Sequence, residues 1–333
     1  MEVIFHPKYL EHKQNGNHPE SPHRLKAILN RLEKEKLQNN IVIPEKAEVF
    51  QLNKVHTEKY IEMIKNGRER YLDGGDTYLR NETYNIALLS AGGAIKSLEL
   101  AKEGRKNMAL LRPPGHHSGG DYGGGFCYFN NIGIAAKVSG YDRVAILDID
   151  GHHGNGTSDI FYRDNSVLYV SLHNQGIYPG TGAPYAVGEG KGIGTNVNIP
   201  LKTGAGDSTL NFAWKELISP VLYQYEPEII LVSIGTDGHY KDWMTGLSYS
   251  SQSFVEMSKK FIKSSDDLCD GRISFMLEGG YHLESLSEII AAIVALGEDN
   301  IVDLNYTEVF DKEEKGKKEV LETKKALRHY WTF

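Results

Sequence analysis

The chain has 333 residues, of which 40% are hydrophobic, and this is enough apolar material for the core of one large α/β domain. Lysine and arginine number 37 against 44 aspartate and glutamate residues, so the net charge of -7 leaves no basic surplus for a nucleic acid backbone. No apolar run approaches the roughly 20 residues of a membrane-spanning helix, and the first residues lack a signal-peptide pattern. We therefore expect a single domain over residues 1–333 that is cytoplasmic and binds neither nucleic acid nor membrane.

The chain alternates short apolar runs with longer segments that carry apolar residues at helical spacing. Helices are predicted at Arg24–Leu37, Asn85–Lys102 and Leu283–Leu296. Several strand candidates are apolar on consecutive residues, as in a parallel sheet that helices cover on both faces. The pattern predicts a three-layer αβα sandwich with a mainly parallel central sheet, whose strands lie at Val3–Phe5, Met108–Leu111, Val144–Ile149, Val167–Leu172, Ile229–Ile234 and Ile273–Leu277.

Two further segments have distinctive composition. Gly176–Gly206 is rich in glycine, proline and threonine and has little periodicity, which predicts long ordered loops. Glu308–Lys325 is a dense mixture of both charge signs, which predicts a solvated surface helix.

Polar clusters directly follow four of the predicted strands. Arg-Pro-Pro-Gly-His-His occupies 112–117, Asp-Ile-Asp-Gly-His-His-Gly occupies 148–154, Gly-Thr-Asp-Gly-His occupies 235–239, and Glu-Gly-Gly-Tyr occupies 278–281. Ligands of open α/β sheets bind outside the carboxyl ends of the strands. We therefore expect the four clusters to converge on one crevice.

The second and third clusters carry a candidate metal site. In an extended chain Asp148, Asp150 and His152 point to the same side, and Asp237 arrives from another strand end. Two carboxylates and one imidazole leave a position for water and suit zinc, although ferrous iron or cobalt would also fit. The Asp-X-Asp-X-His pattern alone is equally compatible with a structural role, and the combination with the other clusters favours a metal.

His116 and His117 suit general acid and base chemistry, because imidazole exchanges protons near neutral pH. Asp148 and Asn155 are available to fix the second nitrogen of each ring. Tyr281 follows two glycines and is a candidate donor to a developing oxyanion opposite the metal. These features together indicate metal-dependent hydrolysis of an acyl amide.

The remaining polar and aromatic residues near the clusters receive supporting assignments. Gly125 permits close backbone approach, and Phe126 and Tyr178 are candidate aromatic walls of a narrow channel. We expect His153 to face away from the site with a structural hydrogen bond, and His239 and Asp242 to lie at the rim or surface.

Cys127 supports an alternative, since a thiol near a histidine pair suggests a cysteine amidase. The sequence holds only one other cysteine, Cys269, too few for a disulfide framework, and we expect both to be reduced thiols. A non-catalytic protein that binds acyl amines is a second alternative of another class.

The motifs resemble the zinc-dependent histone deacetylase and acetylpolyamine amidohydrolase family, which has the arginase-like α/β fold. The resemblance begins at His-Pro-Glu (18–20), passes through the clusters at 112–117, 125–131, 148–156 and 178–182, and ends at Gly-Gly-Tyr (279–281). It covers most of the chain except the C-terminal segment, and so many ordered short motifs make it specific.

The resemblance implies a role for each residue of the site. The zinc ligands would be Asp150, His152 and Asp237. His117 would be the general base and acid, His116 its electrostatic partner, and Tyr281 the residue that polarises the amide carbonyl. Asp148 would orient His116 and Asn155 would orient His117; asparagine at 155 is typical of the class II branch. The resemblance also implies a role for Arg24 in an acetate exit channel and a position for Asp76 at the rim. It further implies a structural potassium ion near Asp148, Asp150, His152, Ser171 and Leu172.

The chain departs from the family pattern at two places. Ser118 stands where the family usually has alanine, and Trp243-Met244 replaces a common Pro-Leu. Met244 is apolar, so the entrance lacks an acidic gatekeeper for a charged polyamine. An acetylated protein lysine is therefore the expected substrate and an acetylpolyamine the alternative; the sequence does not indicate the oligomeric state.

Overall fold

The computed structural model describes residues 1–38, 41–67, 70–298, 300–311 and 315–333. Its centre is an eight-stranded sheet in the order β2-β1-β5-β10-β9-β6-β7-β8, and every neighbouring pair in it is parallel. The strands of this sheet are β1 Glu2–Ile4, β2 Ile41–Val42, β5 Asn107–Ala109, β6 Val144–Asp148, β7 Val167–Asn174, β8 Asn196–Leu201, β9 Ile229–Ile234 and β10 Ile273–Leu277. A separate antiparallel pair joins β3 Arg70–Tyr71 to β4 Tyr78–Leu79.

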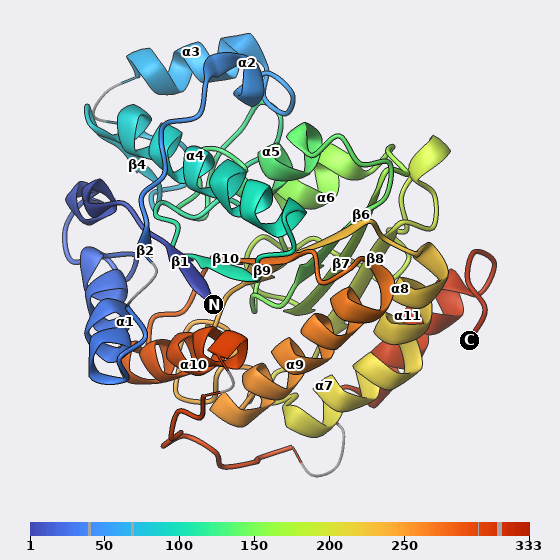
Figure 1. The fold of residues 1–333 in the computed structure, drawn as a ribbon. Helices are drawn as coiled ribbons and strands as arrows, with labels where there is room; N and C mark the ends of the chain where they lie inside the picture. The colour runs from blue at the N-terminus through green and yellow to red at the C-terminus, as the bar shows by residue number, and fades with distance from the viewer. Residues whose placement is uncertain (39–40, 68–69, 299, 312–314) are drawn as a thin grey trace.

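Helices cover both faces of the sheet, and this confirms the predicted three-layer αβα sandwich (Figure 1). The upper layer in that view holds α2 Val49–Leu52, α3 Glu58–Asn66, α4 Thr83–Lys102, α5 Asn131–Val138 and α6 Asn155–Phe161. The lower layer holds α1 Pro22–Lys34, α7 Asp207–Ala213, α8 Ser219–Tyr225, α9 Ser251–Leu268, α10 Leu283–Ala295 and α11 Lys317–Leu327. None of the helices in the described ranges is both long and apolar enough to cross a lipid bilayer.

The central strands are apolar on consecutive residues because both of their faces are buried. In β9, Ile230, Val232 and Ile234 belong to one apolar cluster. The alternate residues Ile229 and Leu231 belong to a second cluster on the opposite face. Each fully buried aliphatic side chain of this kind stabilises the fold by about 1.5–3 kcal/mol relative to an exposed one.

The edge of the sheet departs from the sequence prediction. Residues 196–201 form β8, so the prediction of loops throughout Gly176–Gly206 is wrong for this part. The run reads as irregular because two of its positions are asparagines. Asn196 Nδ2 donates to Ser158 Oγ at 2.9 Å and Asn198 Nδ2 donates to the Ala186 carbonyl at 2.8 Å, so both NH₂ groups find acceptors inside the fold.

The charged C-terminal segment is also less solvated than predicted. Its helix is α11, which packs on β8 and buries Val320 and Leu327 completely. Asp311, which precedes the helix, is fully buried as well. Residues 312–314 of the predicted helix lie outside the described part of the chain. One face of this segment is therefore part of the core.

We predict that Asp311→Ala lowers the free energy of unfolding by about 1–3 kcal/mol, because buried donors lose their acceptor. The Asp311 carboxylate accepts from the backbone N–H groups of Gly206 at 3.0 Å, Thr209 at 3.3 Å and Lys315 at 2.8 Å. Urea denaturation measures the change. The exposed Asp303 provides the control, and equal losses for Asp311→Ala and Asp303→Ala would contradict the prediction.

Candidate active site

The polar clusters meet at the carboxyl edge of the sheet, as predicted from their positions after strands. Asp148 closes β6, while Asp237 and Glu278 follow β9 and β10. Because these strands are parallel neighbours, the segments that follow them leave the sheet at the same edge. They surround a cavity of about 120 Å³, whose lining consists of Asp73, Asp76, Pro114, His116, His117, Gly125, Phe126, Asp150, His152, Tyr178, Met244, Gly279 and Tyr281.

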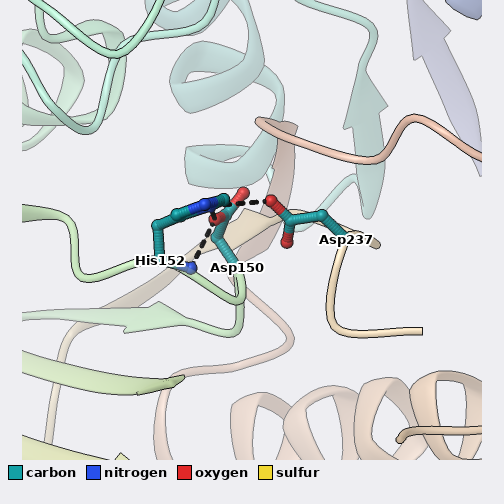
Figure 2. Close-up of side chains that lie close together, drawn as sticks. All are labelled: Asp150, His152 and Asp237. Atoms are coloured by element: carbon teal, nitrogen blue, oxygen red, sulfur yellow. Dashed lines mark hydrogen bonds and ion pairs between the residues drawn. The ribbon is translucent and has the colours of Figure 1, made fainter. Parts of the chain in front are cut away.

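Three of the predicted ligands form one cluster at this cavity. One ligand atom from each of Asp150, His152 and Asp237 lies within 4.8 Å of the other two. His152 Nδ1 is 3.2 Å from Asp150 Oδ1 and 2.9 Å from Asp237 Oδ2. Figure 2 shows the three side chains turned toward one another, with dashed lines joining His152 to both carboxylates.

Backbone N–H groups hold the other oxygen of each carboxylate. Gly279 donates to Asp150 Oδ2 at 2.8 Å, and Gly151 donates to Asp237 Oδ1 at 2.7 Å. A Cβ at Gly279 would lie 2.6 Å from Asp150 Oδ2, so only glycine permits this approach. The oxygens that face His152 are thereby fixed in place, as ligands of a metal must be.

The charges of the cluster match a cation. Burial alone would lower the pKa of His152, but the carboxylates of Asp237 and Asp150 raise it to about 10. Burial and the charge of Asp150 raise the pKa of Asp237 to about 6. The two carboxylates therefore draw a proton onto Nδ1 of His152, at the point where their oxygens converge. A divalent ion held by the same three atoms would replace that proton, so the residues fit a metal.

His116 lies against the carboxylates. Its Nδ1 is 3.1 Å from Asp148 Oδ2, and its Nε2 is 3.8 Å from Asp150 Oδ1. Burial opposes a charge on the ring, but Asp150 and Asp148 raise the pKa of His116 to about 10. The two carboxylates therefore favour a proton on His116, and Asp148 contacts the ring as the sequence predicts.

His117 has the opposite character although it is the next residue. Burial and the neighbouring charge of His116 hold the pKa of His117 well below its ordinary value. Its Nδ1 lies 2.8 Å from Asn155 Oδ1, and an amide oxygen only accepts hydrogen bonds. Nδ1 therefore carries the proton, and Nε2 is free to accept one.

Aromatic rings form the walls of the cavity. The Tyr178 ring centroid is 5.0 Å from that of His117, and the Phe126 centroid is 6.0 Å from that of Tyr281. Gly125 has a φ of 53°, and a Cβ there would lie 2.4 Å from His117 Cδ2. The predicted channel residues therefore lie together, with glycine at the point of closest approach to the histidine.

Tyr281 lines the cavity, and its hydroxyl makes no hydrogen bond to any described residue. Arg24 is buried beneath it, with Cζ 5.0 Å from the ring centroid and Nε donating to the Gly280 carbonyl at 2.6 Å. The phenol is thus available to a ligand, while the backbone before it is held from behind.

The sequence prediction for His239 and Asp242 is wrong, because both are buried rather than at the rim. Asp242 accepts the backbone N–H groups of Tyr281 at 2.6 Å and His282 at 2.9 Å. The carboxylate therefore fixes the loop that presents Tyr281. His239 packs beside Tyr240, with ring centroids 4.6 Å apart.

The mouth of the cavity contains the other predicted residues. Met244 lies on its wall and is partly buried, while the neighbouring Trp243 is 69% exposed. Asp76 is exposed at the opening. The entrance therefore combines an apolar side with a carboxylate.

Sequence reasoning gave no role to two carboxylates that organise the site, although Glu278 belongs to one of the predicted clusters. Glu278 accepts the backbone N–H groups of Gly115 at 2.8 Å and His116 at 3.2 Å, and burial raises its pKa to about 7. Asp73 accepts the N–H of Gly125 at 3.0 Å and that of Thr77 at 3.0 Å. Their signals are a glutamate directly after a predicted strand and an Asp-Gly-Gly-Asp turn.

Cys127 is fully buried, and burial raises the pKa of its thiol well above the ordinary value. A thiol that resists ionisation is a poor nucleophile, so the geometry disfavours the cysteine alternative. His153 faces Thr181, with Nδ1 2.7 Å from the Thr181 hydroxyl, which is the structural hydrogen bond expected of it.

The two carboxylates and the imidazole at the carboxyl edge of this parallel α/β sandwich, with the histidine pair and Tyr281 beside them, fit a metal-dependent amide hydrolase. Comparison with known families gives a match to the histone deacetylase domain over residues 18–296. The chain therefore belongs to the histone deacetylase family, as its motifs predict.

Individual relatives agree with this assignment. The chain is 40% identical over 295 residues to a probable deacetylase of Archaeoglobus fulgidus, and the match covers 85% of this chain and 81% of the relative. It is 38% identical over 301 residues to the chloroplastic histone deacetylase 10 of Oryza sativa subsp. japonica, and the match covers 82% of this chain and 68% of the relative. The crystal structure of the HDA15 HD domain superposes with a TM-score of 0.89 at 30% identity, covering 99% of this chain and 94% of that structure.

We predict that the chain binds one divalent cation at the three-residue cluster and that Asp237→Asn weakens binding at least about tenfold, because the change removes a charged ligand. Calorimetric titration of metal-free protein measures the affinity. Asp311→Asn changes an equally buried carboxylate outside the cluster and serves as the control. Undiminished affinity of Asp237→Asn would remove Asp237 from the ligand set.

Proposed function

We propose that the protein is a zinc-dependent deacetylase that hydrolyses the acetyl amide of acetylated lysine side chains. The observation that carries this proposal is the placement of the Asp150, His152 and Asp237 cluster beside neutral His117 in a narrow aromatic cavity. Zinc suits this ligand set, since two carboxylates and one imidazole leave an open position for reactants.

His117 carries out both proton transfers of the reaction, and His116 serves as its electrostatic partner. Zinc, when bound, supplies Lewis-acid activation of water and of the amide carbonyl. His117 Nε2 takes a proton from the attacking water, because Nδ1–H is fixed on Asn155. The same ring then returns the proton to the departing amine as the carbon–nitrogen bond breaks. His116 keeps its own proton and offsets the negative charge that develops beside it.

Tyr281 supplies the remaining polar group of the site. The residue lines the cavity, and its hydroxyl donates to the carbonyl oxygen as that oxygen becomes an oxyanion. The phenol stays protonated because burial raises its pKa well above the ordinary value. The tetrahedral centre is thus held between a donor and a base.

The entrance favours acetyl-lysine over an acetylated polyamine. Phe126 and Tyr178 line the cavity, and their rings would flank an extended alkyl chain such as the lysine methylene stem. Met244 gives the rim an apolar side. A polyamine carries further ammonium groups, which would be better paired with carboxylates than with this apolar side. Asp76 is the candidate acceptor for an N–H group of the bound substrate. An acetylpolyamine remains the second candidate, because Asp76 and Asp73 make one side of the mouth acidic.

Two finer parts of the proposal have separate grounds, since one rests on the family resemblance and the other on the sequence alone. A structural potassium ion would lie near Asp148 and Ser171, which are register partners on β6 and β7. A cytoplasmic location follows from the sequence expectations alone.

We predict that the purified, zinc-loaded protein releases acetate from an acetyl-lysine peptide faster than from acetylated polyamines. A chelator should abolish turnover and added zinc should restore it, while an alkylating reagent should leave turnover unchanged because Cys127 is buried. Metal content is measured on the same sample. Inactivation by alkylation but not by chelation would support the thiol alternative, and tight substrate binding without acetate release would identify a non-catalytic binding protein.

We predict that Tyr281→Phe keeps its zinc but loses turnover about 100- to 1000-fold, because one oxyanion donor is removed. Steady-state acetate release and metal analysis check both parts. Tyr84→Phe removes a phenol from α4 and should behave as wild type. A wild-type rate for Tyr281→Phe would exclude the tyrosine from the mechanism.

A further inference from the structure

A chain of three polar side chains continues outward from His117 to the surface. Asn155 Nδ2 donates to the Tyr122 hydroxyl at 3.0 Å. The Tyr122 hydroxyl in turn donates to the carboxylate of Asp159. Tyr122 is partly buried and Asp159 is exposed on α6. The amide of Asn155 thus lies between a histidine on one side and a phenol on the other.

The two ends of an asparagine amide are chemically opposite, because its oxygen accepts hydrogen bonds and its nitrogen donates them. With the oxygen toward His117, the ring carries its proton on Nδ1 and leaves Nε2 free. If the amide were turned over, its NH₂ group would face Nδ1. The proton of the neutral ring would then move to Nε2, the atom that must accept a proton from water.

Tyr122 distinguishes these two orientations of Asn155. A phenol has one hydrogen to donate, and that hydrogen is directed to Asp159. Its oxygen therefore offers only a lone pair to Asn155, which attracts the NH₂ group and repels the amide oxygen. Burial and the Asp159 carboxylate raise the pKa of Tyr122 above its ordinary value, so the phenol keeps its hydrogen.

The local sequence holds Tyr122 in this place. Ser118 Oγ is 3.1 Å from the Tyr122 carbonyl, and Gly119 N–H donates to the same carbonyl at 3.0 Å. A Cβ at Gly119 would lie 2.3 Å from the Tyr122 ring, so the ring packs where only glycine leaves room. Ser118 is one of the two positions at which the chain departs from the family pattern.

We propose that Tyr122, together with Asp159, is a positioning residue that fixes the orientation of the Asn155 amide and thereby the tautomer of His117. The inference rests on the proposed function, in which His117 Nε2 accepts the proton. Asp159 directs the phenol hydrogen, the phenol oxygen directs the amide, and the amide oxygen directs the imidazole proton.

Tyr122→Phe tests the proposal, since it removes the hydroxyl and leaves the ring to pack on Gly119. We expect kcat on an acetyl-lysine peptide to fall about tenfold with KM within about twofold, as for loss of an outer-shell partner. Asp159→Asn should act in the same direction without touching the interior. Tyr223 also donates to an aspartate, Asp267, at 2.7 Å on the surface, so Tyr223→Phe is the matched control and should leave kcat unchanged.

A double-variant experiment distinguishes an effect of Tyr122 on the orientation of the Asn155 amide from a general effect of Tyr122 on the packing of the site. Both oxygens of a carboxylate are acceptors, so Asn155→Asp has no amide to turn over. In that background we expect Tyr122→Phe to lower kcat less than about threefold, by the logic of coupled residues. Equal losses in the asparagine and aspartate backgrounds would overturn the proposal, as would an unchanged kcat for Tyr122→Phe in the natural background.

Nitrogen-15 NMR of labelled histidine reads the tautomer of His117 without requiring turnover. The proposal expects a single Nδ1–H form in the natural protein and a mixture of the two neutral forms in Tyr122→Phe. An Nδ1–H form that is unchanged in Tyr122→Phe would overturn the proposal even if acetate release fell. If no acetyl-lysine peptide is hydrolysed but the tautomers shift as expected, the positioning inference holds and the proposed function fails.

Discussion

The mutual repulsion of Asp150 and Asp237 is the constraint on which the rest of the site depends. Both carboxylates are fully buried, and two like charges brought together away from water are costly unless a positive charge stands between them. The fold meets this constraint with His152, whose ring faces both. Backbone N–H groups from Gly151 and Gly279 steady the remaining oxygens. An arrangement so dependent on a central positive charge is one that a divalent ion relieves.

The same negative charge sets the properties of the histidine pair. His116 lies within reach of Asp148 and Asp150, whose carboxylates raise its pKa, and a positive charge on His116 lowers the pKa of His117. The partner of His117 is the amide of Asn155, which adds no charge of its own and so preserves this difference. Two adjacent residues of one type thus serve different purposes because their hydrogen-bond partners differ.

The features that the sequence predicts well are those that a local pattern specifies. Consecutive apolar residues identify the buried strands. The polar clusters at the ends of these strands locate the site, because parallel strands end at one edge of the sheet. Strand β8 was not predicted because Asn196 and Asn198 interrupt its apolar pattern, and the partners of their side chains lie in other segments of the sequence. The sequence misplaced Asp242 and gave Glu278 no role for a related reason. Each is a carboxylate that accepts hydrogen bonds from backbone N–H groups. Every residue type except proline has such a group, so the sequence does not indicate which of them a carboxylate will bind.

The turn at residues 73–77 links the mouth of the cavity to its wall. Asp73 binds Gly125, Thr77 Oγ1 accepts the N–H of Phe126 at 2.8 Å, and Phe126 itself has a φ of 71°, a conformation that side chains rarely adopt without support. Asp76, at the rim, belongs to the same turn. A change in the length of this turn would therefore alter the width of the channel and the charge at its opening together. Selectivity for the substrate's alkyl stem, which the channel width sets, and for the charge of the amine, which the opening sets, would therefore evolve together.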